Sequence, residues 1–386
     1  MTQVHGTVAS GFESVREEFA TVADGEARDG GAQLAVYHRG ELVVDLWGGE
    51  GVDGDTLLAL YSSSKGVTAL VAALLVQDGA IELDREVSAY WPEFAAEGKG
   101  AVTVRELLAH RAGAIGATGG FSLAELADDR VVAARVAAHA PYWTPGTGHG
   151  YHALTFGALV GEVVLRATGR TVQEHYVERV REPYGADYFL GLPEELEARF
   201  RTALPVRPTP AQAAFEAEHP VAPDSLLAVA FDQQADPPFD VLAYGNSRAV
   251  HAAAPLSGGG VGTARGLARV YAAVAGELDG RPPLLKPETL AEFSRTHSSG
   301  TDLVTGETNA FGLGFVPLAT RYPSLGPTAV GHSGVPGSQS LADPSRTLSY
   351  SYARRRFGFL SGPGAPENAR LIAAATAAAD RRDGRG

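Results

Sequence analysis

The sequence predicts an α+β fold, an α/β sandwich in which an antiparallel sheet is built from both ends of the chain and flanked by helices. Runs of β-forming residues lie near the N-terminus and again after residue 310, and the stretch between them has the apolar spacing of helices. We therefore expect an α/β domain formed by residues 1–83 and 305–386, and a mostly helical subdomain formed by residues 84–304. The functional site should lie between them.

The N-terminal part is predicted to begin with a helix and to continue with a hairpin. Apolar residues recur every three to four positions over 8–24, which is the spacing of a helix. Two β-rich runs, 33–38 and 42–47, flank the short turn Arg39-Gly40 and predict two paired strands. An apolar helix follows, so we expect the sheet to pack on it.

Helical patterns separated by Gly/Pro loops continue through the middle of the chain. We expect helices over 102–110, 123–139, 155–166, 171–181 and 264–278. Residues 203–245 are rich in Pro, Ala and Asp without clear periodicity, which predicts a long surface excursion that could cover a site. Beyond residue 310 we expect strands over 310–317, 328–332, 338–342 and 348–352, and a last helix over 366–380.

The apolar helix lies within residues 61–79 and starts in an unusual way. It opens with three serines and Lys65, and then runs almost without polar residues to Gly79. This pattern is typical of a buried helix that has a serine at its N-cap and a left-handed glycine at its end. A lysine in the first turn of a buried helix is costly unless it has a role.

Ser62 and Lys65 form a candidate pair of nucleophile and base. The chain has only two other lysines, Lys99 and Lys286, and otherwise uses arginine. Arginine keeps its proton in proteins, whereas a desolvated lysine can lose it, so this position is expected to need a base. Residues three apart share a helix face, about 5–6 Å apart at Cβ. The alternative interpretation is a serine-rich N-cap with a lysine whose amine reaches solvent.

A second candidate is the Gly-rich loop 145–153, which leads into a predicted helix. Tyr151 lies near this junction, where a constrained backbone can hold a phenol towards a cleft. A phenol near an ammonium group can have its pKa lowered and serve as a proton shuttle. The alternative is a tyrosine that only packs a helix start. His149 and His152 could ligate a metal, but no carboxylate at helical spacing supports that interpretation.

The third candidate is the Gly- and Pro-rich stretch 330–337, which borders a predicted strand. Glycines in such a strand mark a place where the backbone closely approaches another group. An edge of this kind can offer a backbone N–H to a developing oxyanion, and His332 and Ser333 would reach the same cleft. The alternative is an ordinary glycine-rich turn.

Composition excludes several classes of partner. The net charge of −13 argues against binding to nucleic acid or to an anionic membrane surface. The chain has no cysteine, which excludes disulfides and thiolate metal sites. The longest apolar run is too short to cross a bilayer, and the N-terminus lacks the pattern of a secretory signal. We expect a cytoplasmic protein without metal or cofactor; its oligomeric state is left open.

Taken together, the motifs resemble those of a known superfamily. Ser62-x-x-Lys65, Tyr151 after a Pro-Gly turn, and His332-Ser333-Gly334 ahead of Asp343-Pro344 occur in the order found in serine hydrolases of the class C β-lactamase and penicillin-binding fold. The resemblance covers residues from about 30 to 360 and is greatest to the β-lactamase-like carboxylesterases. It implies the β-lactamase/transpeptidase-like form of the α+β fold.

The resemblance also implies roles for individual residues. Ser62 would attack the acyl carbonyl, and Lys65 and Tyr151 would form the proton relay. The backbone N–H groups of Ser62 and Val335 would form the oxyanion hole, assisted by the positive end of the apolar helix. The residues expected to contact substrate are His152, His332, Ser333 and Gly334.

Two departures from the superfamily pattern bear on substrate. Lactamases carry Tyr-x-Asn, and the third residue here is Ala153, so the amide that would steady the lysine is absent. At the position of their Lys-Thr-Gly motif this chain has His332, a mostly neutral imidazole in place of a fixed cation. Both changes favour ester chemistry over β-lactam or peptide chemistry.

The sequence therefore predicts a serine hydrolase that acts on small-molecule carboxylic esters through an acyl-enzyme on Ser62. An acyltransferase that passes the acyl group to an amine or alcohol acceptor in natural-product biosynthesis is the main alternative, because it would use the same acyl-enzyme. A β-lactamase, a D-amino-acid peptidase and a non-catalytic binding protein are less favoured.

Overall fold

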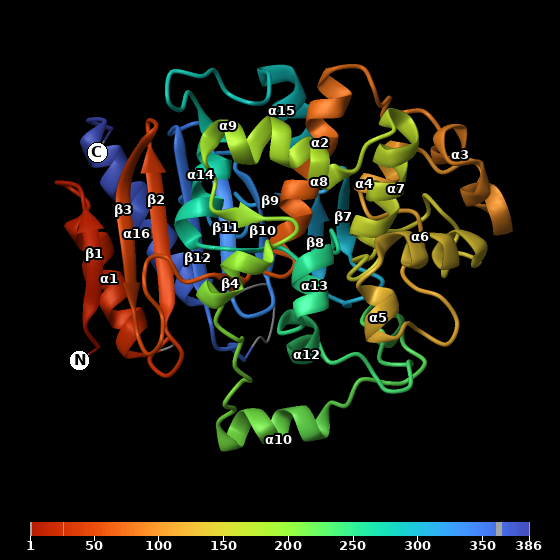
Figure 1. Ribbon diagram of the computed structural model, residues 1–386, viewed down its shortest axis with the longest axis horizontal. Helices are drawn as coiled ribbons and strands as arrows, with labels where there is room; N and C mark the ends of the chain where they lie inside the picture. Colours follow the sequence, from red (N-terminus) through yellow and green to blue (C-terminus); the bar gives the residue numbers. More distant parts are fainter. Residues whose placement is uncertain (1, 26, 360–364, 386) are drawn as a thin grey trace.

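The structure is a computed structural model that describes residues 2–25, 27–359 and 365–385. Its centre is a seven-stranded antiparallel sheet in the order β1-β3-β2-β12-β11-β10-β9. The strands of the N-terminal part are β1 (Val4–Val8), β2 (Ala32–His38) and β3 (Glu41–Gly48), and those of the C-terminal part are β9 (Val316–Pro317), β10 (Val330–Gly334), β11 (Ser338–Asp343) and β12 (Leu348–Arg354). Both ends of the chain build the sheet (Figure 1), which confirms the predicted fold class.

The β2–β3 hairpin forms where the sequence predicts it. Arg39 and Gly40 both have positive φ, of 53° and 78°, which suits a two-residue turn between twisted strands. The pairing joins Leu34 to Leu46 and Val36 to Val44. Strand β1 pairs with β3 and was not predicted, because its five residues alternate between half-buried and exposed and carry little hydrophobic signal.

Helices cover both faces of the sheet. Successive side chains of a strand point to opposite faces. Leu34 and Val36 of β2 accordingly pack with α1 (Glu13–Asp24) and α16 (Glu367–Arg382), while Ala35 and Tyr37 belong to the core on the other face. That second face is covered by α14 (Ala264–Ala275), which packs on β2, β11 and β12, and by α2 (Ser63–Gln77), which contacts β10 and β11. The result is a three-layer sandwich.

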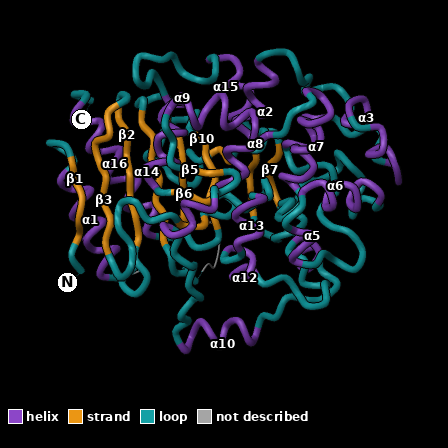
Figure 2. Tube along the Cα trace, viewed as in Figure 1, coloured by secondary structure: helices purple, strands orange, loops and turns teal. Residues whose placement is uncertain are grey.

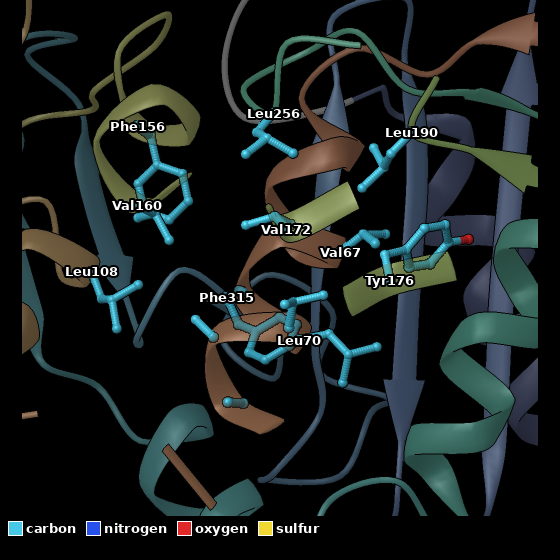
Figure 3. Packing of buried hydrophobic residues seen from close by; sticks show 14 of the residues in the cluster. Val67, Leu70, Leu108, Phe156, Val160, Val172, Tyr176, Leu190, Leu256 and Phe315 are labelled. Atoms are coloured by element: carbon cyan, nitrogen blue, oxygen red, sulfur yellow. The ribbon is translucent and has the colours of Figure 1, made fainter. Parts of the chain in front are cut away.

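Helix α2 is the axis of the larger core. Every residue from Ser63 to Leu75 is buried. Figure 3 shows Val67 and Leu70 of this helix among side chains from α7, α8 and the loop at Phe315. Gly79, just after the helix, has a φ of 75°, as predicted for its left-handed end. Burial on all sides explains why the helix lacks a polar face.

The middle of the chain is mainly helical (Figure 2). Its helices up to residue 199 are α3 (Val87–Tyr90), η1 (Pro92–Gly98), α4 (Val104–Leu108), α5 (Leu123–Leu126), α6 (Asp129–Ala138), α7 (Phe156–Thr168), α8 (Val172–Tyr176), η2 (Val177–Arg181), α9 (Glu182–Tyr184) and η3 (Glu194–Arg199). Those that follow are α10 (Pro210–Glu218), α11 (Leu226–Ala230), α12 (Val241–Gly245), α13 (Arg248–Ala253) and α15 (Pro287–Ser294). Two small sheets complete the fold, one of β4 (Leu58–Ala59), β6 (Val261–Gly262) and β5 (Tyr188–Phe189), the other of β7 (Ser298–Thr301) and β8 (Thr308–Phe311).

Some boundaries differ from those expected. The helix expected over 123–139 is divided in two, because the Asp128 side chain accepts hydrogen bonds from the amides of Arg130 and Val131 and so begins a new helix. The 203–245 excursion contains three short helices, and α10 has no buried residue and projects from the body (Figure 1). The division into two domains stays a prediction, and α14, which lies in the predicted helical part, packs on the sheet.

The described helices differ from helices that cross a bilayer. None of them combines the length and the hydropathy needed to cross a membrane.

Candidate active site

Ser62 lies at the start of α2, directly after a strained residue. Tyr61 has a φ of 45°, a conformation that is costly for a side chain of its size. This bend brings Ser62 to the surface of a pocket while the next residues enter the core. Although Ser62 occupies the N-cap position, its hydroxyl caps no backbone N–H. The hydroxyl contacts Lys65 instead.

Lys65 is fully buried and has three polar contacts. Its Nζ atom lies 2.7 Å from the carbonyl oxygen of Ala153, 2.7 Å from that of Ser257 and 3.2 Å from Ser62 Oγ. A neutral amine has two N–H groups, and each can donate a hydrogen bond to one of the two carbonyls. Its lone pair is then left for the Ser62 hydroxyl, the arrangement that a general base needs.

The environment of Lys65 also favours the neutral amine. Burial lowers the pKa of Lys65 to about 7, and the negative charge of Asp129 opposes this shift. A substantial fraction of the side chain is therefore unprotonated at neutral pH. The buried position of Lys65 agrees with the prediction that a desolvated lysine here can lose its proton.

The two neighbouring serines have no access to the same chemistry. The Ser64 hydroxyl donates to the carbonyl of Tyr61 and accepts from the amide of Gly260 and the phenol of Tyr188. Ser63 is fully buried, and its hydroxyl has no partner among the described residues. Of the three serines only Ser62 faces the pocket.

Tyr151 approaches Ser62 from the opposite wall. Its phenol shares a hydrogen bond with the Ser62 side chain, and its ring centroid lies 5.1 Å from Lys65 Nζ. The ring stacks almost parallel to Phe311, with 6.1 Å between centroids. Its backbone N–H donates to the buried carboxylate of Asp302, which fixes the loop.

The pKa of Tyr151 corrects one expectation. A phenol beside an ammonium group was expected to have a lowered pKa. Burial instead raises the pKa of Tyr151 above its usual value of 10, even though the hydrogen bond to Ser62 acts in the opposite direction. Since a substantial fraction of Lys65 is neutral, the positive charge that could stabilise a phenolate is reduced. The phenol therefore stays protonated and can donate a hydrogen bond.

The third wall is the end of β10. A Cβ atom on Gly334 would lie 2.4 Å from the carbonyl oxygen of Leu60, so only glycine allows this close approach to the backbone before Ser62. The close approach predicted from the glycines is therefore present. The backbone N–H groups of Ser62 and Val335 have no backbone acceptor among the described residues, and both residues line the pocket.

His332 presents one free nitrogen in the same pocket. Its Nδ1 lies 2.8 Å from the Ser333 carbonyl and so carries the proton, whereas its buried Nε2 has no partner among the described residues. Burial and the nearby Lys65 lower the pKa of His332 to about 3. The imidazole is therefore a neutral hydrogen-bond acceptor.

The pocket itself has a volume of about 170 Å³. Its described lining combines aromatic rings, backbone and a few polar groups: Ser62, Tyr151, Phe231, Thr305, Glu307, Asn309, Ala310, Phe311, Val316, Arg321, His332, Ser333, Gly334 and Val335. It contains the predicted residues Ser333 and Gly334 as well as Ser62 and Tyr151, whereas Lys65 is buried behind Ser62 and does not line it. Phe231 comes from the 203–245 excursion, which therefore contributes to the site.

His152 lies elsewhere. Its side chain is fully buried, and both ring nitrogens are engaged by the backbone, one by the carbonyl of Gly150 at 2.7 Å and the other by the amide of Ala114 at 3.2 Å. It does not line the pocket. The placement therefore does not support the predicted contact with substrate, and the ring braces the loop that carries Tyr151. Among the described residues no group of three or more His, Asp or Glu side chains could hold a metal ion.

Three residues that support the site were not predicted from the sequence. Ser257 holds Lys65 through its carbonyl, Asp302 holds the Tyr151 loop, and Phe231 lines the pocket. The only signal for Ser257 was its position before a run of glycines, and an isolated aspartate such as Asp302 carried none.

The family model described as Beta-lactamase matches residues 19–375. Among curated proteins, the chain is 31% identical to Esterase/beta-lactamase LipL of Mycobacterium tuberculosis over 381 residues, which cover 92% of this chain and 83% of that protein.

Solved structures agree with these matches. EstA from Arthrobacter nitroguajacolicus Rue61a superimposes with a TM-score of 0.89 at 39% identity, over 99% of each chain. A family VIII carboxylesterase superimposes with a TM-score of 0.86 at 36% identity, over 97% of this chain and all of the other.

Proposed function

Since the chain belongs to the Beta-lactamase family, we propose that it is a serine esterase that cleaves small carboxylic esters through an acyl-enzyme on Ser62. The family and the neighbouring structures support a serine hydrolase of the esterase/β-lactamase type. The observation that carries the ester mechanism is the position of Lys65. Two carbonyls bind the nitrogen of Lys65, and the lone pair of the neutral amine is then left for Ser62 Oγ.

In the acylation step, the lone pair of Lys65 takes the Ser62 proton as Oγ attacks the ester carbonyl. A bond forms between Oγ and the carbonyl carbon, and the carbonyl oxygen becomes an oxyanion. The amides of Ser62 and Val335, which have no backbone acceptor among the described residues, are suited to stabilise this charge. The dipole of α2 acts in the same direction.

Collapse of the intermediate breaks the bond to the leaving alcohol, and the alkoxide needs a proton. Tyr151 shares a hydrogen bond with Ser62 and remains protonated, so it is suited to donate and to recover its proton from Lys65. In deacylation, water loses a proton to Lys65 and attacks the acyl carbon. The bond between the acyl carbon and Ser62 Oγ then breaks, and the proton on Lys65 passes to Oγ. Free acid and free enzyme result.

The lining of the pocket supports a small ester as substrate. Tyr151, Phe231 and Phe311 present an aromatic surface to an acyl or alkyl group. At the position where the superfamily carries a lysine, the neutral Nε2 of His332 accepts a hydrogen bond and is not a fixed cation; Arg321 is the cationic residue in the described lining. We accordingly propose turnover of short-chain nitrophenyl esters in preference to β-lactams.

Acyl transfer remains the second candidate, because hydrolysis and transfer share the acyl-enzyme. The specific observation in its favour is Phe231, through which the 203–245 excursion reaches the pocket and could limit access of water. An amine or alcohol acceptor would then compete with water for the acyl group.

The decisive experiment combines an ester panel with active-site labelling. Esters of varied chain length are assayed with and without amine and alcohol acceptors, and a fluorophosphonate adduct is sought by mass spectrometry. We expect an adduct on Ser62, ester cleavage that disappears in Ser62→Ala, and free acid as the main product. Diversion of product by acceptors favours transfer. Absence of an adduct, or full activity in Ser62→Ala, would overturn the proposal.

A further inference from the structure

Asp129 is a half-buried carboxylate outside the substrate pocket. It is the first residue of α6, and its Oδ2 accepts a hydrogen bond from the backbone N–H of Leu256 at 2.8 Å. Asp129 also lines a separate cavity of about 300 Å³ at the surface, together with Asp128 and Glu162. No step of the proposed reaction uses this residue.

The segment that Asp129 binds is the one that holds Lys65. Directly after Leu256, the carbonyl of Ser257 accepts the Lys65 amine at 2.7 Å. The same segment is fixed from α2, where Thr68 donates to the Leu256 carbonyl at 3.2 Å. It is fixed from α7 as well, where the amide of Gly157 donates to the Ser257 hydroxyl at 2.7 Å.

Packing completes the connection. Gly157 has no room for a side chain, since a Cβ there would lie 2.2 Å from the Ser257 nitrogen. The Leu256 side chain belongs to the same core cluster as Val67 of α2 (Figure 3). The Ser257 carbonyl therefore has little freedom to move, and Asp129 adds a carboxylate contact to the segment.

We propose that Asp129 is a positioning residue for Lys65: it anchors the 256–257 segment whose carbonyl holds the amine, and its charge sets the balance between amine and ammonium. The inference rests on the proposed function of Lys65 as the base. It assigns a role in the reaction to a residue that touches neither substrate nor Ser62.

The charges around the pair support this role. Burial raises the pKa of Asp129 to about 7, and Lys65 opposes that shift while Asp128 reinforces it. Other titratable groups near Lys65 are His110, His152 and His332, whose pKa values burial lowers, and Tyr151, whose pKa burial raises. Tyr244, whose pKa burial and Asp129 both raise, stays neutral. Asp129 is thus the charged partner of Lys65, and the two titrate as a pair.

The test is the pH dependence of Ser62 labelling by a fluorophosphonate in the whole protein, which requires no knowledge of the substrate. Asp129→Asn keeps an oxygen for the Leu256 amide but removes the charge that favours the ammonium form. The labelling rate falls on the acid side of its pH profile, and this acid limb should therefore move to lower pH by about 0.5 to 1 unit. Asp129→Ala removes the hydrogen bond as well, and the plateau rate should also fall about tenfold or more.

Asp128→Asn is the matched control. Asn is a good N-cap, so α6 is kept, while a neighbouring exposed charge is removed. Its acid limb should stay close to that of the wild type. An Asp129→Asn limb that coincides with the wild-type limb would overturn the inference even if Asp129→Ala does not fold. Absence of Ser62 labelling at every pH would instead overturn the proposed function, so the two failures are distinguishable.

Discussion

The amine of Lys65 is held at 2.7 Å by the backbone carbonyl of Ala153, the residue whose side chain lacks the amide expected from the superfamily. The main-chain oxygen of this residue therefore binds the amine although its side chain carries no amide. A second carbonyl, that of Ser257, lies at the same distance. Substituting Ala153 cannot remove its carbonyl, so the role of the amine is tested first through Lys65 itself.

Lys65→Arg should lose almost all esterase activity while the protein stays folded. Arginine keeps a positive charge and cannot accept the Ser62 proton. We expect kcat/KM to fall by about 10²–10⁴-fold, the usual contribution of a general base. Fluorophosphonate labelling of Ser62 should slow in parallel. Retention of more than about a tenth of the wild-type rate would exclude Lys65 as the base.

The pH profile of kcat/KM should show an acid limb near pH 7. Burial lowers the pKa of Lys65 to about 7, and the base must be unprotonated, so activity is lost as the pH falls through this value. His332 does not titrate in this range, because its pKa is lowered to about 3. His332→Asn should therefore leave the limb in place. Its disappearance in that variant would assign the limb to the histidine.

The core of the site could be predicted because its residues are close in sequence. Ser62 and Lys65 are separated by one helical turn, and the surrounding apolar residues show that the turn is buried. The close backbone approach at Gly334 was also evident from the glycines beside a strand. Local patterns of this kind need no knowledge of the tertiary structure.

The remaining parts depend on contacts between distant segments. Ser257 lies 192 positions from Lys65, and no pattern in either segment indicates that its carbonyl holds the amine. The predicted direction of the Tyr151 pKa shift was wrong for the same reason. The sequence shows a nearby cation but not the complete burial of the phenol. His152 was expected to contact substrate, whereas both of its ring nitrogens bind the backbone.

Asp302→Ala should destabilise the fold and reduce activity together. The buried carboxylate accepts hydrogen bonds from the amides of Tyr151, Val304 and Thr305, and these donors would be left without a partner. We expect the free energy of unfolding to fall by about 2–4 kcal/mol, measured by urea denaturation. Asp302→Asn retains one acceptor oxygen and should lose less. Equal stability of the alanine variant and the wild type would contradict this role.

Gly334→Ala should damage catalysis more than stability. The added Cβ would lie 2.4 Å from the Leu60 carbonyl, so strand β10 must move away from the start of α2. That movement separates the amides of Ser62 and Val335, and loss of one oxyanion donor typically lowers kcat by about 10²–10³-fold. The measurement is kcat per folded molecule, at a temperature where the variant remains folded.

Gly331→Ala is the matched control for this prediction. It lies in the same strand, and its Cβ would lie 2.0 Å from the Ser340 carbonyl in β11, on the side of the strand away from α2. Both variants should therefore strain β10 and lower the melting temperature. Only Gly334→Ala should lower kcat per folded molecule by the amount expected for an oxyanion donor. If the two variants lose kcat equally, the effect is a general distortion of the strand, and Val335 does not stabilise the oxyanion.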